Sequence, residues 1–291
     1  MNLLITGAGG QVGRELALRL GGGDLALDRA ALDLTDAAAV GATLAHHRPR
    51  VVINAAAYTA VDQAEQDPEA ANAINAAAVA HLAAACAAVG AVLIHLSTDY
   101  VFDGTAAMPY TDDQPAAPLG VYGASKWAGE QALRAALPQH LILRVSWVFG
   151  QFGHNFVKTM LRVGRDRDLL KVVADQRGGP TAAADIADTL MSLARRAAQA
   201  EALPWGTYHY AGQPFVSWHG FAEAIFAEAV AAGVLDRAPQ VQAISTAEYP
   251  TPAKRPAQSS LDMQRSVAQL GLQPPDWRAS LHTLMQDLKA S

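Results

Sequence analysis

Two short stretches of the chain contain residue types that could transfer a proton to a carbonyl oxygen. Tyr122 and Lys126 stand four positions apart in a segment with helical spacing, which places them on one helix face. Tyrosine, with an ordinary pKa of ~10, needs a nearby cation to titrate near neutral pH. Lys126 can supply that cation, and Thr98, at the end of an apolar run, can hold the substrate oxygen. We expect Tyr122 to be the proton donor; taken alone, the pair could equally belong to an ordinary surface helix.

A glycine-rich segment near the start of the chain has the spacing of a dinucleotide-binding loop. Gly7, Gly10 and Gly13 lie between a short apolar run and a helical pattern, with Gln11 and Val12 inside the loop. The first glycine allows a tight turn, the second a close approach to a pyrophosphate, and the third close helix packing. The first amides of the helix would then face the phosphates. A plain glycine-rich turn is the alternative.

The segments after the second and third apolar runs would complete the cofactor site. Asp28 ends the second run, where a carboxylate favours the ribose hydroxyls of NAD, whereas the neighbouring Arg29 could pair with the phosphate of NADP. The sequence therefore predicts NADH or NADPH without choosing between them. Further residues are expected beside the adenine, phosphate and ribose: Asp33, Leu34, Ala57, Tyr58 and Thr59.

Strand and helix signals alternate over the first half of the chain. We expect strands at residues 2–6, 25–28, 51–54, 91–97 and 141–146, and helices at 11–20, from Asp36 toward His47, from Pro68 through an alanine-rich stretch, and at 122–136. Such alternation predicts an α/β fold, a Rossmann-type doubly wound parallel sheet covered by helices on both faces. Ligands of such sheets bind at the carboxyl ends of the strands.

The pattern loosens after about residue 150. Short strands near 170–173 and 207–210 alternate with helices near 184–198 and 218–231. We expect residues 1–150 to form the NAD(P)-binding domain, and residues 151–291 to form mainly a smaller C-terminal substrate-binding lobe, with later segments returning to the first domain.

Composition restricts the class of protein. The 291 residues are 51% hydrophobic with a net charge of −5, which argues against a nucleic-acid-binding surface. The single cysteine, Cys86, excludes an internal disulfide and has small apolar neighbours, so we expect it to be buried. The first residues lack a signal-peptide pattern, and no apolar run reaches the ~20 residues that span a bilayer. We expect a cytoplasmic protein that does not enter a membrane.

Taken together, these motifs resemble the extended short-chain dehydrogenases/reductases, and more closely the dTDP-4-dehydrorhamnose reductase family. The resemblance covers nearly the whole chain, in blocks at residues 7–13, 54–65, 97–105, 121–130, 143–150, 154–161, 175–181 and 250–262. It implies NAD(P)H-dependent reduction of the C4 keto group of dTDP-4-dehydro-L-rhamnose. The product would be dTDP-L-rhamnose, a precursor of surface polysaccharide.

The resemblance also implies roles for individual residues. Tyr122 would donate the proton, Lys126 would orient the cofactor, and Thr98 would assist. The substrate would further contact Asp99, Trp147, Asn155 and Arg255, of which the last two would hold the nucleotide. A guanidinium suits a diphosphate because it offers a fork of donors, although Arg255 could also be an exposed loop residue.

One departure concerns magnesium. Some family members are dimers bridged by Mg²⁺ through three glutamates. Here Glu15 is present, but Ala184 stands at the second position with Asp185 beside it, and Asp287 stands at the third. Mg²⁺ is therefore doubtful; we expect no metal site, and either a monomer or a homodimer.

Two other functions remain open on the sequence. The first is a nucleotide-sugar epimerase or dehydratase of the same fold; a dehydratase has an acidic pair after the strand-end threonine, but here Tyr100 follows Asp99. The second is a regulatory subunit that acts only by binding. The intact Thr98, Tyr122 and Lys126 favour catalysis.

Overall fold

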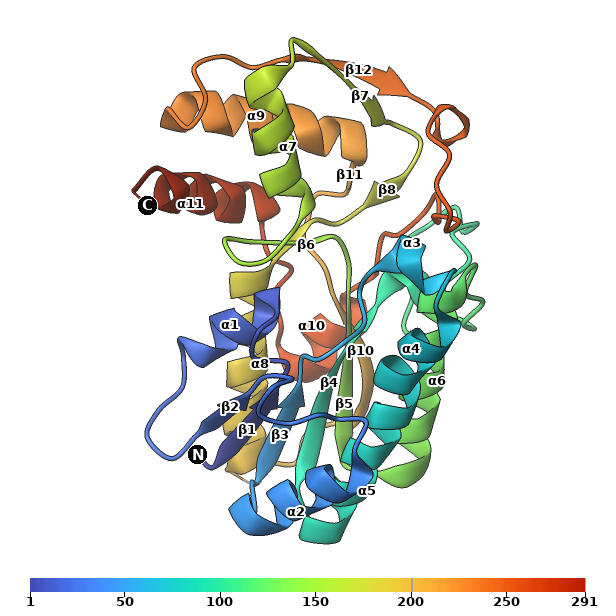
Figure 1. Cartoon of the computed structure of the whole chain (residues 1–291), viewed down its shortest axis with the longest axis vertical. Coiled ribbons are helices and arrows are strands. Elements are labelled where there is room, and N and C mark those ends of the chain that lie inside the picture. The colour runs from blue at the N-terminus through green and yellow to red at the C-terminus, as the bar shows by residue number, and fades with distance from the viewer. Residues whose placement is uncertain (200, 291) are drawn as a thin grey trace.

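A six-stranded parallel sheet forms the larger part of the protein, seen in a computed structural model that describes residues 1–199 and 201–290 (Figure 1). Its strands lie in the order β10-β5-β4-β3-β1-β2. They are β1 (Leu3–Thr6), β2 (Leu25–Leu27), β3 (Val51–Asn54), β4 (Val92–Thr98), β5 (His140–Val145) and β10 (Gly206–Tyr210). Four of them, β1, β3, β4 and β5, are almost wholly buried, as strands covered by helices on both faces must be.

The strand order creates a crevice beside β1. This strand pairs with β2 on one side and with β3 on the other, so that Thr6 faces both Leu27 and Asn54. The connections that leave β1 and β3 run to opposite sides of the sheet, which opens a space at the carboxyl ends of the two strands. The fold thus places a ligand crevice where the glycine-rich loop begins.

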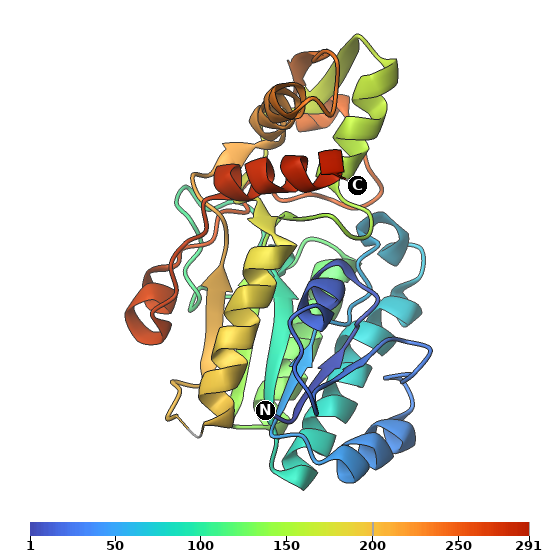
Figure 2. The same ribbon diagram turned by 90° about the vertical axis from the view of Figure 1, so that its left-hand side faces the viewer.

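Helices cover both faces of the sheet (Figures 1 and 2). One face carries α2 (Ala37–His47), α3 (Val61–Ala64), α4 (Pro68–Asn72), the π-helical turn η1 (Ala73–Ala77), α5 (Ala78–Val89) and α6 (Val121–Ala136). The other face carries α1 (Gln11–Ala17) and α8 (Ala183–Ala198), while α10 (Gln264–Leu270) packs against β10. The helix expected after Asp36 is confirmed, because the Asp36 carboxylate accepts hydrogen bonds from the amides of Ala38 and Ala39.

The alanine-rich helix expected from Pro68 is also confirmed. It runs through α4, η1 and α5, begins at the side-chain cap Asp67 and ends at Gly90 in a left-handed conformation. By length and composition this helix could cross a membrane, but it packs between α2 and α6. Cys86 on this helix is buried, which raises the pKa of its thiol to about 12 and leaves it unreactive near neutral pH.

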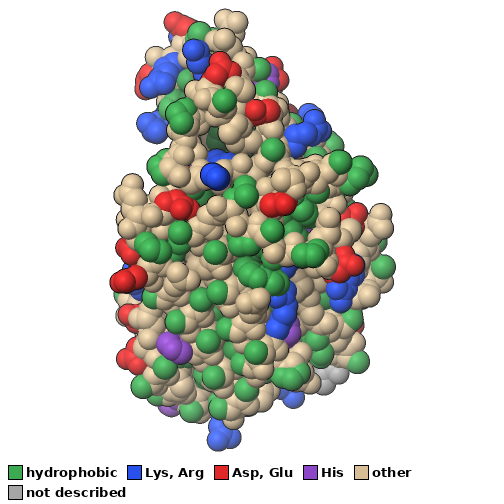
Figure 3. Space-filling view, turned by 90° about the vertical axis from the view of Figure 1, so that its right-hand side faces the viewer, with side chains coloured by type: hydrophobic (Ala, Val, Ile, Leu, Met, Phe, Trp, Pro, Cys, Tyr) green, Lys and Arg blue, Asp and Glu red, His purple; other side chains and the backbone are tan. Residues whose placement is uncertain are grey.

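A second hydrophobic core forms a narrower lobe above the sheet, and Figure 3 shows this lobe and the hollow beneath it. Its helices are α7 (Phe156–Asp166), α9 (Trp218–Ala232) and α11 (Trp277–Ala290), packed against β7 (Leu169–Val173) and β12 (Gln240–Ile244). Short strand pairs join the lobe to the sheet: β6 (Val148–Phe149) with β9 (Thr181–Ala182), and β8 (Arg177–Gly178) with β11 (Val216–Ser217). Two single turns, η2 (Asp99–Val101) and η3 (Thr246–Glu248), complete the described elements.

The predicted α/β class is confirmed, and the expected strands and helices of the first half differ from the observed ones mainly at their ends. After residue 150 the chain serves both parts of the molecule. The segment near 207–210 is β10, which pairs with β5 at the edge of the main sheet, and α8 packs beside α1. Periodicity identified these two elements but could not say which core they join, because both cores bury similar apolar faces.

Helix α6 lies unusually close to its neighbours because glycines face them. A Cβ on Gly129 would lie 2.0 Å from the carbonyl oxygen of Asn75 in η1, and one on Gly123 would lie 2.1 Å from that of Tyr100 in η2. Real Cβ atoms do not approach backbone oxygens so closely, so a side chain at either position would push the helix away.

We expect Gly129→Ala to lower the free energy of unfolding by about 1–3 kcal/mol, because the added methyl overpacks the contact with η1. Gly41→Ala is the matched control: this glycine lies inside α2 with nothing within 4 Å of a built Cβ. Alanine there should stabilise by about 0.5–1 kcal/mol. Urea unfolding of both variants provides the measurement, and equal stability of Gly129→Ala and the parent would show that α6 is not held in this way.

Candidate functional site

The crevice beside β1 brings together most of the residues expected to bind the cofactor. A cavity of about 290 Å³ opens there. Its walls include the predicted residues Gly7, Gly10, Asp28, Arg29, Asp33, Leu34, Ala57 and Tyr58, together with Gly9, Leu32, Ala55, Ala56 and Ile74. Of the remaining predicted residues, Val12 is buried in the core and Thr59 is exposed beside Tyr58.

The three glycines of the motif differ in what they approach. Gly7 has a φ of +79°, and a Cβ there would lie 2.4 Å from the amide nitrogen of Ala56; a Cβ on Gly13 would lie 2.0 Å from the carbonyl oxygen of Gly7. These two glycines are required by the protein's own packing. A Cβ on Gly10 would meet only one protein atom, at 3.4 Å. The room at Gly10 is open space in front of the amides at the start of α1, which suits a pyrophosphate.

Tyr58 lines the same cavity and is held by its backbone. Asn75, buried in η1, accepts a hydrogen bond from the Tyr58 amide at 2.9 Å and donates to its carbonyl oxygen at 3.0 Å. The Tyr58 hydroxyl is buried without a hydrogen-bond partner among the described residues. Buried polar groups are rarely left unpaired, so this hydroxyl is available to hydrogen-bond a ligand. Together with the open space at Gly10, it fits the binding of a nucleotide.

Tyr122 lies at the start of α6, against the end of β4. It shares a hydrogen bond with Thr98, and its ring meets that of Tyr100 edge-on with centroids 5.5 Å apart. Burial raises the pKa of Tyr122 above its usual range, and the charge of Asp99 adds to this effect. The protein alone therefore does not lower this pKa in the way that the spacing to Lys126 predicted, and Tyr122 keeps its proton near neutral pH.

Thr98 and Asp99 form one hydrogen-bonded unit beside that tyrosine. The Thr98 hydroxyl donates to Asp99 at 2.9 Å and accepts from the amide of Tyr100 at 3.2 Å. Burial raises the pKa of the Asp99 carboxyl to about 6, although hydrogen bonds from Ser259 and Thr98 oppose the rise. A second titratable group therefore lies next to the proposed proton donor.

Lys126 is buried one helical turn after Tyr122 and points toward β4. Its Nζ donates to the carbonyl oxygen of Leu96 at 2.7 Å and lies 3.3 Å from Nε2 of His95. Burial lowers the pKa of Lys126 to about 8. The sequence pattern did not indicate a role for His95, because this residue occupies a position inside strand β4. Its only signal was a polar residue within an apolar run.

Two acidic residues hold α6 in place, and the sequence pattern did not indicate this role for either of them. Glu65 accepts a hydrogen bond from the amide of Val121 at 2.8 Å, which satisfies a free donor at the helix start. Glu130, fully buried, accepts from Arg144 at 2.8 and 2.9 Å and from the Ser97 hydroxyl at 2.5 Å. Burial alone would raise the pKa of Glu130, but Arg144 and Ser97 keep it below its usual value. Both carboxylates fix the helix that carries Tyr122.

Arg255 reaches the same region from the C-terminal part of the chain. It donates to the hydroxyl of Tyr100 at 3.0 Å and to the carboxylate of Asp62 at 2.7 Å. Because Tyr100 contacts the ring of Tyr122, the guanidinium lies one side chain away from the proposed proton donor. This arrangement joins three segments that are distant in the sequence.

The other two predicted substrate residues have partners within the protein. Trp147 adopts a positive φ of 47° and stacks on Trp218, with ring centroids 3.5 Å apart. Asn155 caps α7 by accepting from the amide of Lys158, and it donates to Gln11 at 2.9 Å and to Gly150 at 2.8 Å. The contact of Asn155 with Gln11 links the lobe to the start of α1. Their roles toward a substrate stay predictions.

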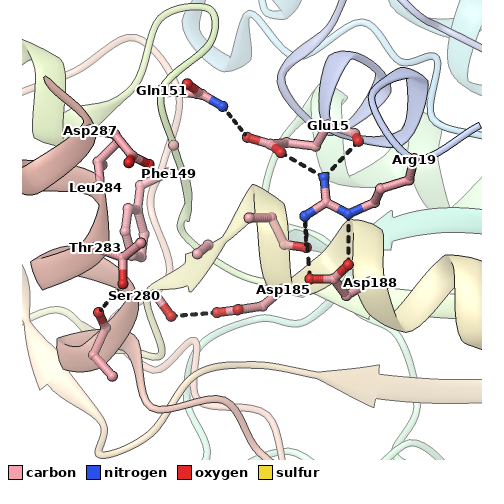
Figure 4. A pocket seen from close by; sticks show the side chains of 14 residues that line it. Glu15, Arg19, Phe149, Gln151, Asp185, Asp188, Ser280, Thr283, Leu284 and Asp287 are labelled. Atoms are coloured by element: carbon pink, nitrogen blue, oxygen red, sulfur yellow. Dashed lines mark hydrogen bonds and ion pairs between the residues drawn. The ribbon is translucent and has the colours of Figure 1, made fainter. Parts of the chain in front are cut away.

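The residues considered for magnesium line a separate cavity of about 520 Å³ between α1, α8 and α11 (Figure 4). Arg19 lies within it, pairing with Glu15 at 2.8 Å and with Asp188 at 2.7 Å. The Asp185 carboxylate accepts from Ser280 at 2.6 Å. Magnesium prefers several oxygen ligands without a competing cation, and the described residues provide no group of three side chains placed to hold a metal. Within one chain, Arg19 pairs with carboxylates that Mg²⁺ would need; the expectation that no metal bridges two subunits stays a prediction.

Comparisons with known proteins identify the family of this chain. The family model described as "RmlD substrate binding domain" matches residues 1–290. A curated dTDP-4-dehydrorhamnose reductase of Aggregatibacter actinomycetemcomitans is 49% identical over 286 residues, which cover 97% of each chain. The crystal structure of a dTDP-4-dehydrorhamnose reductase from Bacillus anthracis in complex with NADP has a TM-score of 0.90 at 37% identity, with 98% of both chains covered.

Other nucleotide-sugar enzymes are less similar. The UDP-glucose 4-epimerase of Thermus thermophilus, in complex with NAD, has a TM-score of 0.78 at 21% identity over the whole of both chains, a likeness in fold alone. The family model matches residues 1–290, and the curated reductase is similar enough, at 49% identity over 97% of each chain, to share its family. The chain therefore belongs to the RmlD family, whose curated members include the dTDP-4-dehydrorhamnose reductases.

Proposed function

We propose that this protein reduces the C4 keto group of dTDP-4-dehydro-L-rhamnose with NADPH or NADH, giving dTDP-L-rhamnose. The observation that supports it most is that Tyr122, Thr98 and Lys126 meet at the carboxyl end of β4, on the same edge of the sheet as the cavity at the glycine-rich loop. The substrate is inferred from the relatives of this chain, which are dTDP-4-dehydrorhamnose reductases.

The chemistry assigned to the chain's own residues is proton delivery and orientation. The cofactor would supply the hydride. Thr98 and Tyr122 would hold the substrate oxygen, and Tyr122 would release its proton as negative charge develops there. Arg255, with Tyr100, would hold the nucleotide's phosphates. Tyr122 holds its proton near neutral pH, and the cation of Lys126 would help to stabilise the phenolate that remains after the transfer.

Two alternatives from the sequence fit less well. An epimerase or dehydratase would share the fold, but the epimerase relative is only 21% identical, whereas the curated reductase is 49% identical. A purely regulatory binding protein has no need of a buried lysine and tyrosine against a strand-end threonine. The cytoplasmic location, the absence of nucleic-acid and membrane partners, the oligomeric state and the division of domains near residue 150 stay predictions.

Cofactor preference depends on two neighbouring side chains in the crevice. The Asp28 carboxylate accepts hydrogen bonds from the amides of Ala30 and Ala31, both at 3.0 Å, so it is held at the end of β2. Arg29 lines the same cavity. We propose that Asp28 faces the ribose hydroxyls, that Arg29 meets a 2′-phosphate, and that the protein accepts both cofactors with a modest preference.

Tyr122→Phe removes only the hydroxyl, and we expect kcat to fall by about 10²–10⁴-fold because general acid catalysis is lost. NADPH affinity, measured by fluorescence titration, should stay near the parent value. Tyr110→Phe is the matched control, since this buried tyrosine donates to Asp103 away from the crevice. Near-parental turnover in Tyr122→Phe would refute its assignment as the proton donor.

Arg29→Ala should lower kcat/KM for NADPH about tenfold or more relative to NADH, because a charge-assisted contact to the 2′-phosphate is lost. Asp28→Ala should shift the ratio the other way. Arg195→Ala, an exposed arginine in the last turn of α8, is the control and should change neither value. An unchanged NADPH/NADH ratio in Arg29→Ala would mean that the phosphate is held elsewhere.

A further inference from the structure

A chain of buried polar side chains crosses the sheet behind the proposed catalytic lysine. Thr6 at the end of β1 donates its hydroxyl hydrogen to Oδ1 of Asn54 at 2.8 Å. Nδ2 of Asn54 lies 3.1 Å from Nδ1 of His95, and Nε2 of His95 lies 3.3 Å from Nζ of Lys126. All four residues are at least 98% buried. Interactions between such groups are little weakened by solvent.

The backbone determines the orientation of the Asn54 amide. The amide nitrogen of Ala56 lies 3.0 Å from Oδ1 of Asn54, and a backbone N–H can only donate. Oδ1 is therefore the acceptor, and the NH₂ group faces His95. Because that group can only donate, Nδ1 of His95 must accept, and the ring proton of a neutral His95 is on Nε2.

This tautomer has a consequence for Lys126. The Nε2–H of His95 is a donor aimed at Nζ, while Nζ itself donates to the carbonyl oxygen of Leu96 at 2.7 Å. An ammonium group would place hydrogen against hydrogen at His95. A neutral amine has a lone pair that accepts this hydrogen bond.

We propose that His95 is a positioning residue that sets the charge state of Lys126, acting as a hydrogen-bond donor because Asn54 has fixed its tautomer. The inference rests on the proposed role of Lys126 and deepens it. A lysine that releases its proton near neutral pH can help to restore the proton that Tyr122 gives up, because proton transfer is efficient when the donor's pKa lies near the working pH.

The surrounding charges agree with this direction. Burial lowers the pKa of His95 well below its usual range, and the charges of Lys126 and of His140 on β5 act the same way, so the ring is neutral. Burial also lowers the pKa of Lys126 to about 8, opposed by Glu130 on α6. The charge of Glu130 is offset by Arg144 on β5 and Arg134. Asp99 and Tyr100 in η2 act on Tyr122.

The tautomer can be measured directly in the cofactor-free parent protein by ¹⁵N NMR of labelled histidine. We expect His95 to carry its proton on Nε2 and to stay neutral between about pH 6 and 9. Its signal is identified among the nine histidines by its contact with the Lys126 side chain. A proton on Nδ1, or an imidazolium in this range, would overturn the proposal.

The influence on Lys126 can be measured by titrating ¹³Cε of the five lysines, with Lys126→Met to identify its signal. Asn54→Asp keeps both acceptor contacts but removes the donor to His95. The ring proton should then move to Nδ1, and Nε2 should accept from the ammonium. We expect the Lys126 midpoint to rise by about one to two pH units.

The added charge could act on Lys126 without His95, so the comparison needs a second background. In His95→Phe an aromatic ring still fills the space, but it has no nitrogen that could change its protonation. In this background Asn54→Asp should raise the Lys126 midpoint by less than half as much. Equal shifts in both backgrounds would refute the role of His95. If His95→Phe does not fold, the ¹⁵N spectrum of Asn54→Asp decides the proposal: the ring proton of His95 should move to Nδ1 as the Lys126 midpoint rises, and a midpoint that rises while the proton stays on Nε2 would refute the role of His95.

The same change should be visible in catalysis. With Lys126 active as an ammonium, kcat/KM should fall as pH rises through its midpoint near 8, and this fall should move to higher pH in Asn54→Asp. If the fall of kcat/KM stayed at the same pH while the ¹³Cε midpoint of Lys126 moved, the link between this lysine's charge and turnover would be contradicted. The NMR measurements need neither substrate nor cofactor, so they remain valid even if Tyr122 proves not to be the proton donor.

Discussion

The proposed chemistry depends on how closely helix α6 packs against its neighbours, because this helix carries both Tyr122 and Lys126. The helix can lie against η1 and η2 only where glycine leaves room for the backbone oxygens of Asn75 and Tyr100. Glu65 satisfies its first amide, and the buried Glu130–Arg144 pair joins its middle to β5. Leaving one member of a buried pair without its partner would be costly, so the register of the helix against the sheet is strongly specified.

The parallel sheet then brings the remaining groups to the same edge. Thr98 ends β4, Asn54 ends β3 and Thr6 ends β1, so a polar row forms where these strands finish. The first turn after β1 provides open backbone for a pyrophosphate, and the lobe above the edge supplies Trp147 while the loop before α10 supplies Arg255. Substrate and cofactor would meet in the hollow between the two cores, where burial shifts the pKa values of Tyr122, Lys126 and Asp99.

Local patterns were sufficient to predict the sheet of the first half, the glycine loop and the pair Tyr122 and Lys126. Each of these is encoded within a few residues, by hydrophobic periodicity or by fixed spacing. His95, Glu65 and Asp62 could not be found in this way, since each acts on a residue that is distant in the chain. The same holds for β10 and α8, whose patterns identify a strand and a helix but not the core that buries them. Sequence spacing also could not show that Arg19 lies among the carboxylates considered for magnesium. This arginine pairs with Asp188, which is distant in the chain.

A reductase would transfer hydride once, from the nicotinamide to C4 of the sugar, without returning it. This single transfer is tested most directly with reduced cofactor deuterated at the transferable position and dTDP-4-dehydro-L-rhamnose, followed by NMR of the sugar. We expect one deuterium at C4 of the product for each oxidised cofactor released. A sugar altered without deuterium at C4, or with no net oxidation of the added cofactor, would contradict a reductase and indicate an enzyme that recycles its hydride.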